Sequence, residues 1–309
     1  MSPLSRRSFF KTFLQSGLAV AGLGLLENAA RAIEPVKRPG GARFRTSLVA
    51  YSFRDLFLTK DPAKKMDLFK YVDFAAAHGF DGVEITQYYF PKEVTGEYLA
   101  SLRRHCFLRG VAVSGSGVGN NFALPKGEKL DEQIRDVKRR VDYAQVLGAP
   151  FVRVFSGGVR KGDPLSENDA RASVIAALEE CADYAGQKGI FLGLENDGGL
   201  TTDVAGTLAI IQGVKSKWLG SNLDTGNFSA TDDVYGDLAQ LAPYAINVHF
   251  KSQVRPRGKP QPMDIPRILK MLQAVNYQGY LGLEFEATED PLQGVPSLLK
   301  NLRGALQNA

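Results

Sequence analysis

Short apolar runs alternate along the chain with segments in which apolar residues recur at helical spacing. Nearly every run is a short apolar one rather than an alternation of apolar and polar residues, which is typical of parallel strands covered on both faces. We predict eight strands, at residues 46–53, 82–85, 111–114, 151–155, 190–195, 219–224, 245–250 and 280–285. A helix is predicted after each strand, at residues 65–78, 98–108, 130–147, 167–188, 204–214, 234–241, 265–275 and 295–306.

This alternation predicts an α/β protein, a (β/α)8 TIM barrel in a single domain. Eight strand–helix units between residues 46 and 306 match that fold in number and size. A doubly wound open sheet is the alternative. That fold usually has a glycine-rich phosphate loop after its first strand, whereas residues 51–55 read YSFRD here.

Four consecutive predicted strands end in a side chain that can bind a metal. These residues are Glu195, Asp224, His249 and Glu284. In a TIM barrel the carboxyl ends of all strands open onto one face, and neighbouring strands lie about 4.8 Å apart. We therefore expect the four side chains to converge on one divalent ion. Three carboxylates and one imidazole favour Mn²⁺, with Mg²⁺, Co²⁺ and Zn²⁺ as alternatives.

Further polar residues near these strand ends are candidates for holding a substrate. Lys251 follows His249 by two residues, so both point the same way from an extended segment, although a solvated loop lysine has the same spacing. Glu84 ends the second predicted strand and is a candidate substrate ligand, with a buried ion pair as the alternative. Glu286 shares the strand parity of Glu284 and is the alternative fourth metal ligand.

The first residues are predicted to be an export signal. Arg6 and Arg7 precede an apolar stretch at 13–26, and Ala30 and Ala32 supply the small residues of a cleavage site. The pattern resembles a twin-arginine signal, which the twin-arginine translocase reads to export folded proteins to the bacterial periplasm. We expect a signal peptide at 1–32 and a mature domain at 33–309. No stable membrane anchor is expected after cleavage, because no second apolar run reaches the length of about 20 residues that a membrane span needs. A cytoplasmic protein with a basic start is the alternative.

Charge gives little reason to expect a nucleic-acid partner. The chain carries a net charge of +5, of which the predicted signal contributes +3. The mature chain is therefore close to neutral. Cys106 and Cys181 fall in separate helical segments and compel no disulfide. The expected partners are a small molecule and the translocase, and a homo-oligomer stays open.

Four motifs resemble the sugar phosphate isomerase/epimerase family, a group of xylose-isomerase-like barrels. They lie at residues 192–196 (LGLEN), 224–228 (DTGNF), 248–251 (VHFK) and 277–284 (YQGYLGLE). The resemblance covers about residues 46–306, and the family includes ketose 3-epimerases, hydroxypyruvate isomerase and inosose dehydratase. Its members share the metal site and differ in their loops, so the motifs define the superfamily better than the substrate.

The resemblance implies a divalent-metal-dependent isomerase or epimerase, and export favours a non-phosphorylated sugar or keto-sugar as its substrate. In such enzymes the metal polarises a carbonyl, and a carboxylate removes the proton from the neighbouring carbon. Glu195 and Glu284 match the paired carboxylates that work on opposite faces of the substrate. Arg255 matches an arginine that contacts substrate oxygens. Asn227 stands where the epimerases often carry a histidine; it can bond substrate but cannot shuttle protons, which weighs against simple epimerisation of a free ketose.

Three other functions are weighed beside this one. A lyase or dehydratase acting on a keto-glycoside or inosose would use the same site and the same proton removal. A non-catalytic exported sugar-binding protein would need no metal chemistry. The apurinic endonuclease branch of the superfamily uses a histidine-rich site with several metals, which one strand-end histidine cannot build.

Overall fold

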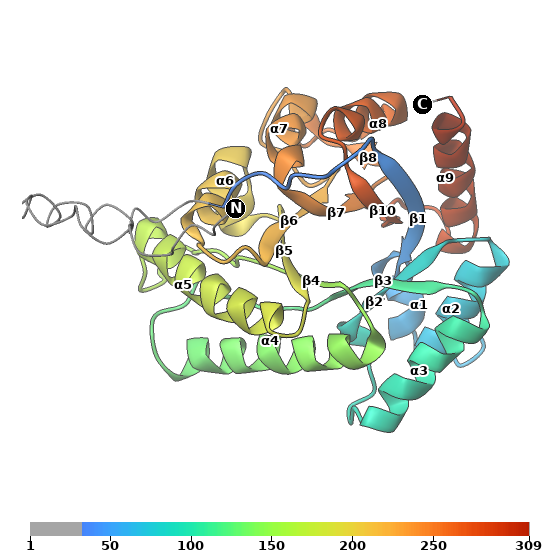
Figure 1. The fold of residues 1–309 in the computed structure, drawn as a ribbon, viewed down its shortest axis with the longest axis horizontal. Coiled ribbons are helices and arrows are strands. Elements are labelled where there is room, and N and C mark those ends of the chain that lie inside the picture. The colour runs from blue at the N-terminus through green and yellow to red at the C-terminus, as the bar shows by residue number, and fades with distance from the viewer. Residues whose placement is uncertain (1–32, 309) are drawn as a thin grey trace, which may run out of the picture. The chain divides into compact units, whose positions relative to one another are not determined.

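A closed barrel of parallel strands forms the centre of the protein (Figure 1). This computed structural model describes residues 33–308, and the predicted export signal with Arg6 and Arg7 lies outside them. The strand order around the barrel is β1-β10-β7-β6-β5-β4-β3-β2, and β1 closes it by pairing with both β2 and β10. The strands are β1 (Arg43–Val49), β2 (Gly82–Thr86), β3 (Ala112–Gly117), β4 (Phe151–Val154), β5 (Phe191–Glu195), β6 (Leu219–Asp224), β7 (Ala245–Phe250) and β10 (Gln278–Leu283). The predicted single-domain TIM barrel is confirmed.

Helices surround the barrel and cover the outer face of its strands (Figure 1). The main helices are α2 (Leu68–Ala77), α3 (Gly96–Leu108), α4 (Glu128–Leu147), α5 (Glu167–Gly186), α6 (Val204–Gly213), α7 (Val234–Leu241), α8 (Ile265–Ala274) and α9 (Pro291–Leu306). Local sequence sets their ends: the Asp67 carboxylate accepts from two backbone amides at the start of α2, and Gly148 takes a left-handed φ of 79° after α4. Every helix predicted from periodicity is present.

The helix α4 shows how the apolar pattern fixes a helix on the barrel. Its buried residues form one stripe along the helix: Leu130, Ile134, Val137, Val141, Ala144 and Leu147. Spacings of three and four residues place them on a single face, which packs toward the strands. The opposite face is rich in charged residues and meets solvent. The core therefore lies between helices and strands, and the barrel interior is left for other side chains.

The first strand is shorter than predicted. It ends at Val49, and the chain continues through a 3₁₀ turn (Ala50–Phe53) into the short helix α1 (Arg54–Leu58). Ala50 and Phe53 are buried in this turn as they would be in a strand, so burial pattern alone could not separate the two conformations. A small hairpin of β8 (Gln253–Val254) and β9 (Gln261–Pro262), which was not predicted, follows β7.

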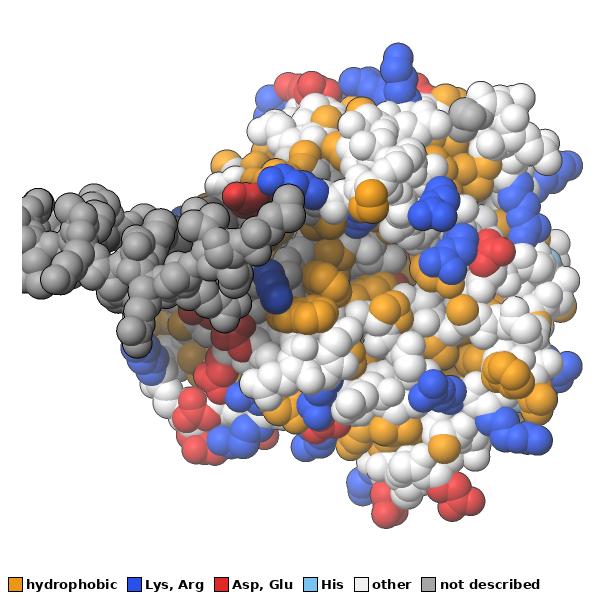
Figure 2. All heavy atoms as spheres, in the orientation of Figure 1, with side chains coloured by type: hydrophobic (Ala, Val, Ile, Leu, Met, Phe, Trp, Pro, Cys, Tyr) orange, Lys and Arg blue, Asp and Glu red, His pale blue; other side chains and the backbone are white. Residues whose placement is uncertain are grey.

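The surface carries charges of both signs. In Figure 2, lysine and arginine side chains are spread among acidic and apolar ones rather than gathered over one element. Cys106 and Cys181 are buried and free, in α3 and α5. Within residues 33–308, no helix is long and apolar enough to cross a membrane.

Candidate metal centre

The four predicted strand-end residues meet at one end of the barrel. One ligand atom from each of Glu195, Asp224, His249 and Glu284 lies within 4.8 Å of the others, and all four residues are buried. The sheet register produces this arrangement, because Asp224 stands beside His249 in the pairing of β6 with β7. Glu284 directly follows the last residue of β10. Glu286, the alternative fourth ligand, is not part of this group.

Two atoms of the group have no hydrogen-bond partner among the described residues. They are Asp224 Oδ2 and His249 Nδ1, and both are buried. The imidazole Nδ1 lies 2.7 Å from Glu195 Oε1, yet this contact lacks the direction of a hydrogen bond. Buried polar atoms are nearly always bonded to protein, water or an ion. Asp224 Oδ2 lies 3.3 Å from Lys251 Nζ, an ion pair without hydrogen-bond geometry. Two buried ligand atoms that make no hydrogen bond, in a group with three carboxylates, therefore fit a bound divalent cation.

His249 is oriented by Glu84. Its Nε2 lies 3.1 and 3.0 Å from the two carboxylate oxygens of Glu84, which turns Nδ1 toward the other three ligands. A carboxylate on the second nitrogen of a ligating histidine is common in metal sites. For Glu84 we expected a strand end and a contact with substrate, with a buried ion pair as the alternative, and the contact with His249 is such a buried pair. The strand β2 instead continues to Thr86, so Glu84 lies inside the barrel, 1% exposed and lining none of the cavities described below.

Two buried asparagines extend this network, and our sequence analysis missed both. Asn247 donates from Nδ2 to Glu84 Oε2 at 3.3 Å and to Asn222 Oδ1 at 2.7 Å. Asn222 in turn donates to Glu195 Oε1 at 2.9 Å. Each asparagine stands two residues before a predicted ligand on its own strand and so faces the same side. That spacing is the signal that could have found them.

Two cations neutralise the carboxylates. Arg153 Nε lies 3.3 Å from Glu195 Oε2, and both side chains are buried. On the other side, Lys251 Nζ lies 2.6 Å from Glu284 Oε2 and also contacts the Glu286 carboxylate. Buried charges persist only when they are paired in this way. Lys251 is therefore a buried partner of the acidic group and not a solvated loop lysine.

The carboxylates differ in how readily they lose their protons. Burial opposes the charged form of Glu195, but Arg153 and His249 outweigh it and hold its pKa below the usual range. For Asp224, burial raises the pKa to about 8, which Lys251 offsets only in part. A cation in the group would favour the charged form of both.

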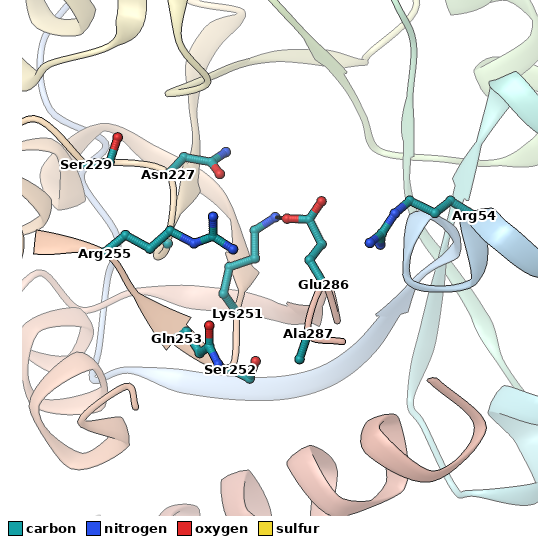
Figure 3. Close-up of a pocket in the computed structure, with 10 residues that line it drawn as sticks. Arg54, Asn227, Ser229, Lys251, Ser252, Gln253, Arg255, Glu286 and Ala287 are labelled. Carbon is teal, nitrogen blue, oxygen red and sulfur yellow. Dashed lines mark hydrogen bonds and ion pairs between the residues drawn. The ribbon is translucent and has the colours of Figure 1, made fainter. Parts of the chain in front are cut away.

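Two adjoining cavities lie next to the group of four proposed ligands. The central cavity, of 250 Å³, is lined by Glu195, Glu284, Lys251 and Asn227 among others. The rim cavity, of 320 Å³, shares Lys251 and Asn227 with it and adds Arg255. Figure 3 shows the Lys251 ammonium and the Glu286 carboxylate pointing toward one another, with Arg255 reaching toward the same space. The predicted substrate residues Lys251, Asn227 and Arg255 thus face these cavities.

Comparison with known proteins agrees with this architecture. Residues 72–305 match the family of xylose isomerase-like TIM barrels, and the chain belongs to that family. A 2-oxo-tetronate isomerase from Pectobacterium atrosepticum is 28% identical over 239 residues, which cover 71% of this chain and 87% of the relative. A human protein to which hydroxypyruvate isomerase activity is provisionally assigned is 25% identical over 238 residues, covering 72% of this chain and 84% of the relative.

Among solved structures, an L-ribulose 3-epimerase has a TM-score of 0.68 at 17% identity, covering 86% of this chain and 97% of the epimerase. At that identity the likeness concerns the fold. The names of the sequence relatives are those of isomerases, and the predicted enzyme class, isomerase or epimerase, is confirmed at that level.

Proposed function

We propose that this protein is a divalent-metal-dependent isomerase or epimerase of a non-phosphorylated sugar or keto-sugar. Glu195, Asp224, His249 and Glu284 would hold the ion, for which we expect Mn²⁺. The observation that carries the proposal is the convergence of four buried ligand residues, with unbonded atoms on Asp224 and His249. When bound, the cation would polarise the substrate carbonyl and make the proton on the neighbouring carbon more acidic.

Glu195 and Glu284 are the groups best placed to move that proton. They flank His249, whose Nδ1 lies 2.7 Å from Glu195 Oε1 and 3.5 Å from Glu284 Oε2. Nearby cations outweigh burial and keep the pKa of both carboxyls low, so both are charged and able to accept a proton at neutral pH. We assign proton removal to one carboxylate and proton return to the other. Return to the opposite face of the same carbon inverts its configuration, as in an epimerase. Return to the former carbonyl carbon moves the carbonyl, as in an isomerase. Arg153 and Lys251 hold the two carboxylates in position.

The substrate oxygens would be held from the side of β6 and β7. Lys251 and Arg255 supply positive hydrogen-bond donors, and Asn227 supplies an amide that donates and accepts. The three side chains line the central and rim cavities. An amide at position 227 binds a hydroxyl without transferring a proton, so Asn227 is a binding residue in this proposal.

A lyase or dehydratase acting on a keto-glycoside or inosose is the second candidate. The reaction starts with the same proton removal; the carbon–oxygen bond one position further then breaks, and its electron pair leaves with the oxygen, which takes a proton. Asn227 favours this candidate, because its amide lines the central cavity but cannot shuttle a proton. Epimerisation and elimination thus differ only after the shared step.

Hydrogen exchange tests the shared step directly. The metal-loaded mature protein is incubated in deuterated water with ketoses and keto-glycosides, and α-deuteration is followed by NMR. We expect exchange that requires the metal and disappears in Glu284→Gln. An isomerised product identifies an isomerase or epimerase, and release of a second unit identifies a lyase. If no substrate exchanges while His249→Ala keeps the sugar affinity of the wild type, the protein is a non-catalytic sugar-binding protein.

We also propose that the protein acts in the bacterial periplasm, after export by the twin-arginine translocase. The paired arginines before an apolar stretch support this localisation. Fractionation of cells expressing the full chain should recover the mature form in the periplasm. Replacing Arg6 and Arg7 with lysine together should leave the precursor in the cytoplasm, and unchanged export of that variant would contradict the assignment.

A further inference from the structure

A larger cavity opens beside the central cavity. It measures 850 Å³, compared with 250 Å³ for the central cavity. Phe155 and Asp197 line both, so the two spaces adjoin on the side of Glu195. The walls come from the loops that follow β3, β4 and β5. We call this space the outer cavity.

The loops around the outer cavity are tied to one another. Asn120 donates from Nδ2 to Phe155 O at 2.8 Å and accepts on Oδ1 from Phe155 N at 2.9 Å. The loops after β4 and β5 touch through glycines: a Cβ on Gly158 would stand 2.6 Å from Gly199 Cα. Such close backbone approach excludes any side chain at these positions. The outer cavity therefore has walls that are fixed by contacts between these loops.

The outer cavity combines apolar and polar surface. Leu124, Val159 and Leu165 line it with aliphatic groups, and Asn121 adds an amide. At the junction with the central cavity, the Asp197 carboxylate takes part in no hydrogen bond or ion pair within residues 33–308; only its backbone amide is bonded, to Thr201. A carboxylate free of protein partners can accept hydrogen bonds from ligand hydroxyls. Apolar faces edged by hydroxyl-binding groups suit a sugar or an aryl group.

We propose that the substrate is a glycoside of two units. The unit that reacts occupies the central cavity, and the group attached to it through the glycosidic bond occupies the outer cavity. Small-molecule sites typically measure about 300–1,000 Å³. The central and rim cavities, at 250 and 320 Å³, lie below or at the low end of that range, whereas the outer cavity, at 850 Å³, lies well within it. A substrate confined to the central cavity would leave the larger outer cavity empty. This inference rests on the proposed function, because it names the substrate class of the same site.

Binding of three probes tests the two-unit proposal. Glucose, cellobiose and 4-nitrophenyl β-D-glucoside are titrated separately into the metal-loaded mature protein by calorimetry. At least one two-unit probe should bind about tenfold or more tightly than glucose, which corresponds to about 1.4 kcal/mol. The tighter of the two tells whether the outer cavity takes a second sugar or an aryl group. Equal affinity for all three probes, or no binding of either two-unit probe, overturns the proposal.

Two tryptophan variants on one loop localise the effect. Leu165→Trp fills the outer cavity, whereas Lys161→Trp adds the same group at an exposed position that does not line it. The two-unit advantage is the tighter binding of a two-unit probe relative to glucose. We expect Leu165→Trp to abolish this advantage and leave glucose binding unchanged, and Lys161→Trp to keep the advantage. Val159→Trp replaces Leu165→Trp if the melting temperature shows that the latter does not fold. A filled cavity that keeps the advantage contradicts the proposal.

Separate measurements distinguish failure of the proposed function from failure of the two-unit substrate. Hydrogen exchange on a single-unit keto-sugar tests the proposed function alone. Exchange without a two-unit advantage would overturn only the inference about the outer cavity. A two-unit advantage without any exchange would overturn the proposed function and leave a glycoside-binding site.

Discussion

Replacing Glu84 with glutamine removes the charge that holds His249 and keeps the size of the side chain. Both residues are buried, and the imidazole Nε2 lies 3.1 and 3.0 Å from the carboxylate oxygens. A hydrogen bond to a charged group contributes about 1.5–3 kcal/mol and a neutral one about 0.5–1.5 kcal/mol. The loss is therefore about 1–1.5 kcal/mol, or about tenfold in metal affinity. This is the low end of the 10–100-fold range typical of such partners, since glutamine keeps one acceptor oxygen.

The Glu84→Gln variant should also change the pH dependence of metal binding. Burial disfavours the charged form of His249, but Glu84, Glu284 and Glu195 outweigh burial and raise its pKa well above the usual value. A metal binds the neutral imidazole, so the wild type must release this proton on binding. Removing the charge of Glu84 lowers the pKa of His249 and reduces that cost. The deficit of the variant should be smallest at low pH and reach its full size at high pH.

Calorimetric titration with Mn²⁺ at several pH values measures both effects. The matched control is Ser114→Ala, which removes a buried hydroxyl that lies 2.5 Å from Ser47 Oγ in the same barrel interior and contacts none of the proposed ligands. Wild-type affinity of Glu84→Gln at every pH would refute the positioning role of Glu84. An equal loss in Ser114→Ala would show that the effect reports a general disturbance of the interior.

Three further predictions concern the ligands and the rim cavity. Metal affinity of the wild type should rise with pH through about 8, because burial raises the pKa of Asp224 to about 8 and a ligand carboxylate must be deprotonated; a flat profile across that range would contradict this. Glu284→Gln should lose bound metal and Glu286→Gln should keep it, and the reverse result in metal analysis would make Glu286 the ligand. Arg255→Gln should raise KM about tenfold with little change in kcat, since it loses a charged hydrogen bond. Arg257→Gln, whose guanidinium pairs with a surface aspartate, is the control on the same loop, and equal KM values would remove Arg255 from the site.

The positions of the four proposed ligands were predictable because each stands at or near the carboxyl end of a largely apolar predicted strand. An apolar run marks a buried strand, and a polar residue at its carboxyl end has few places to point except the open end of the barrel. The same reasoning, carried two residues back along β6 and β7, would have found Asn222 and Asn247. Strand parity is a local property, so it can be read along the chain.

The partner of His249 could not be predicted in the same way. Glu84 is separated from it by 165 residues, and their contact crosses the barrel interior. The pairing of β2 with β3 shifts register between Val83 and Glu84, which no sequence pattern marks. Because β2 continues two residues beyond Glu84, to Thr86, the Glu84 side chain lies inside the barrel and does not line the central cavity. Contacts between distant strands depend on register and closure of the whole barrel.

Loops were the least predictable part of the chain. The outer cavity depends on bonds such as those between Asn120 and Phe155, which join two loops across the barrel end. The hairpin of β8 and β9 that carries Arg255 between its strands has only two residues in each strand, too few for an apolar pattern. Binding residues are often carried on loops, so the family could be identified from the strands before any substrate class.

Metal content shows whether Glu195, Asp224, His249 and Glu284 together hold one divalent ion. The purified mature protein and its His249→Ala variant are loaded with Mn²⁺, freed of excess ion and analysed by mass spectrometry, with circular dichroism to verify folding. We expect about one ion per chain in the wild type and close to none in the folded variant, because a single lost ligand leaves the site incomplete. A wild type that retains no ion, or a His249→Ala variant that retains it fully, would show that these residues do not form the metal site.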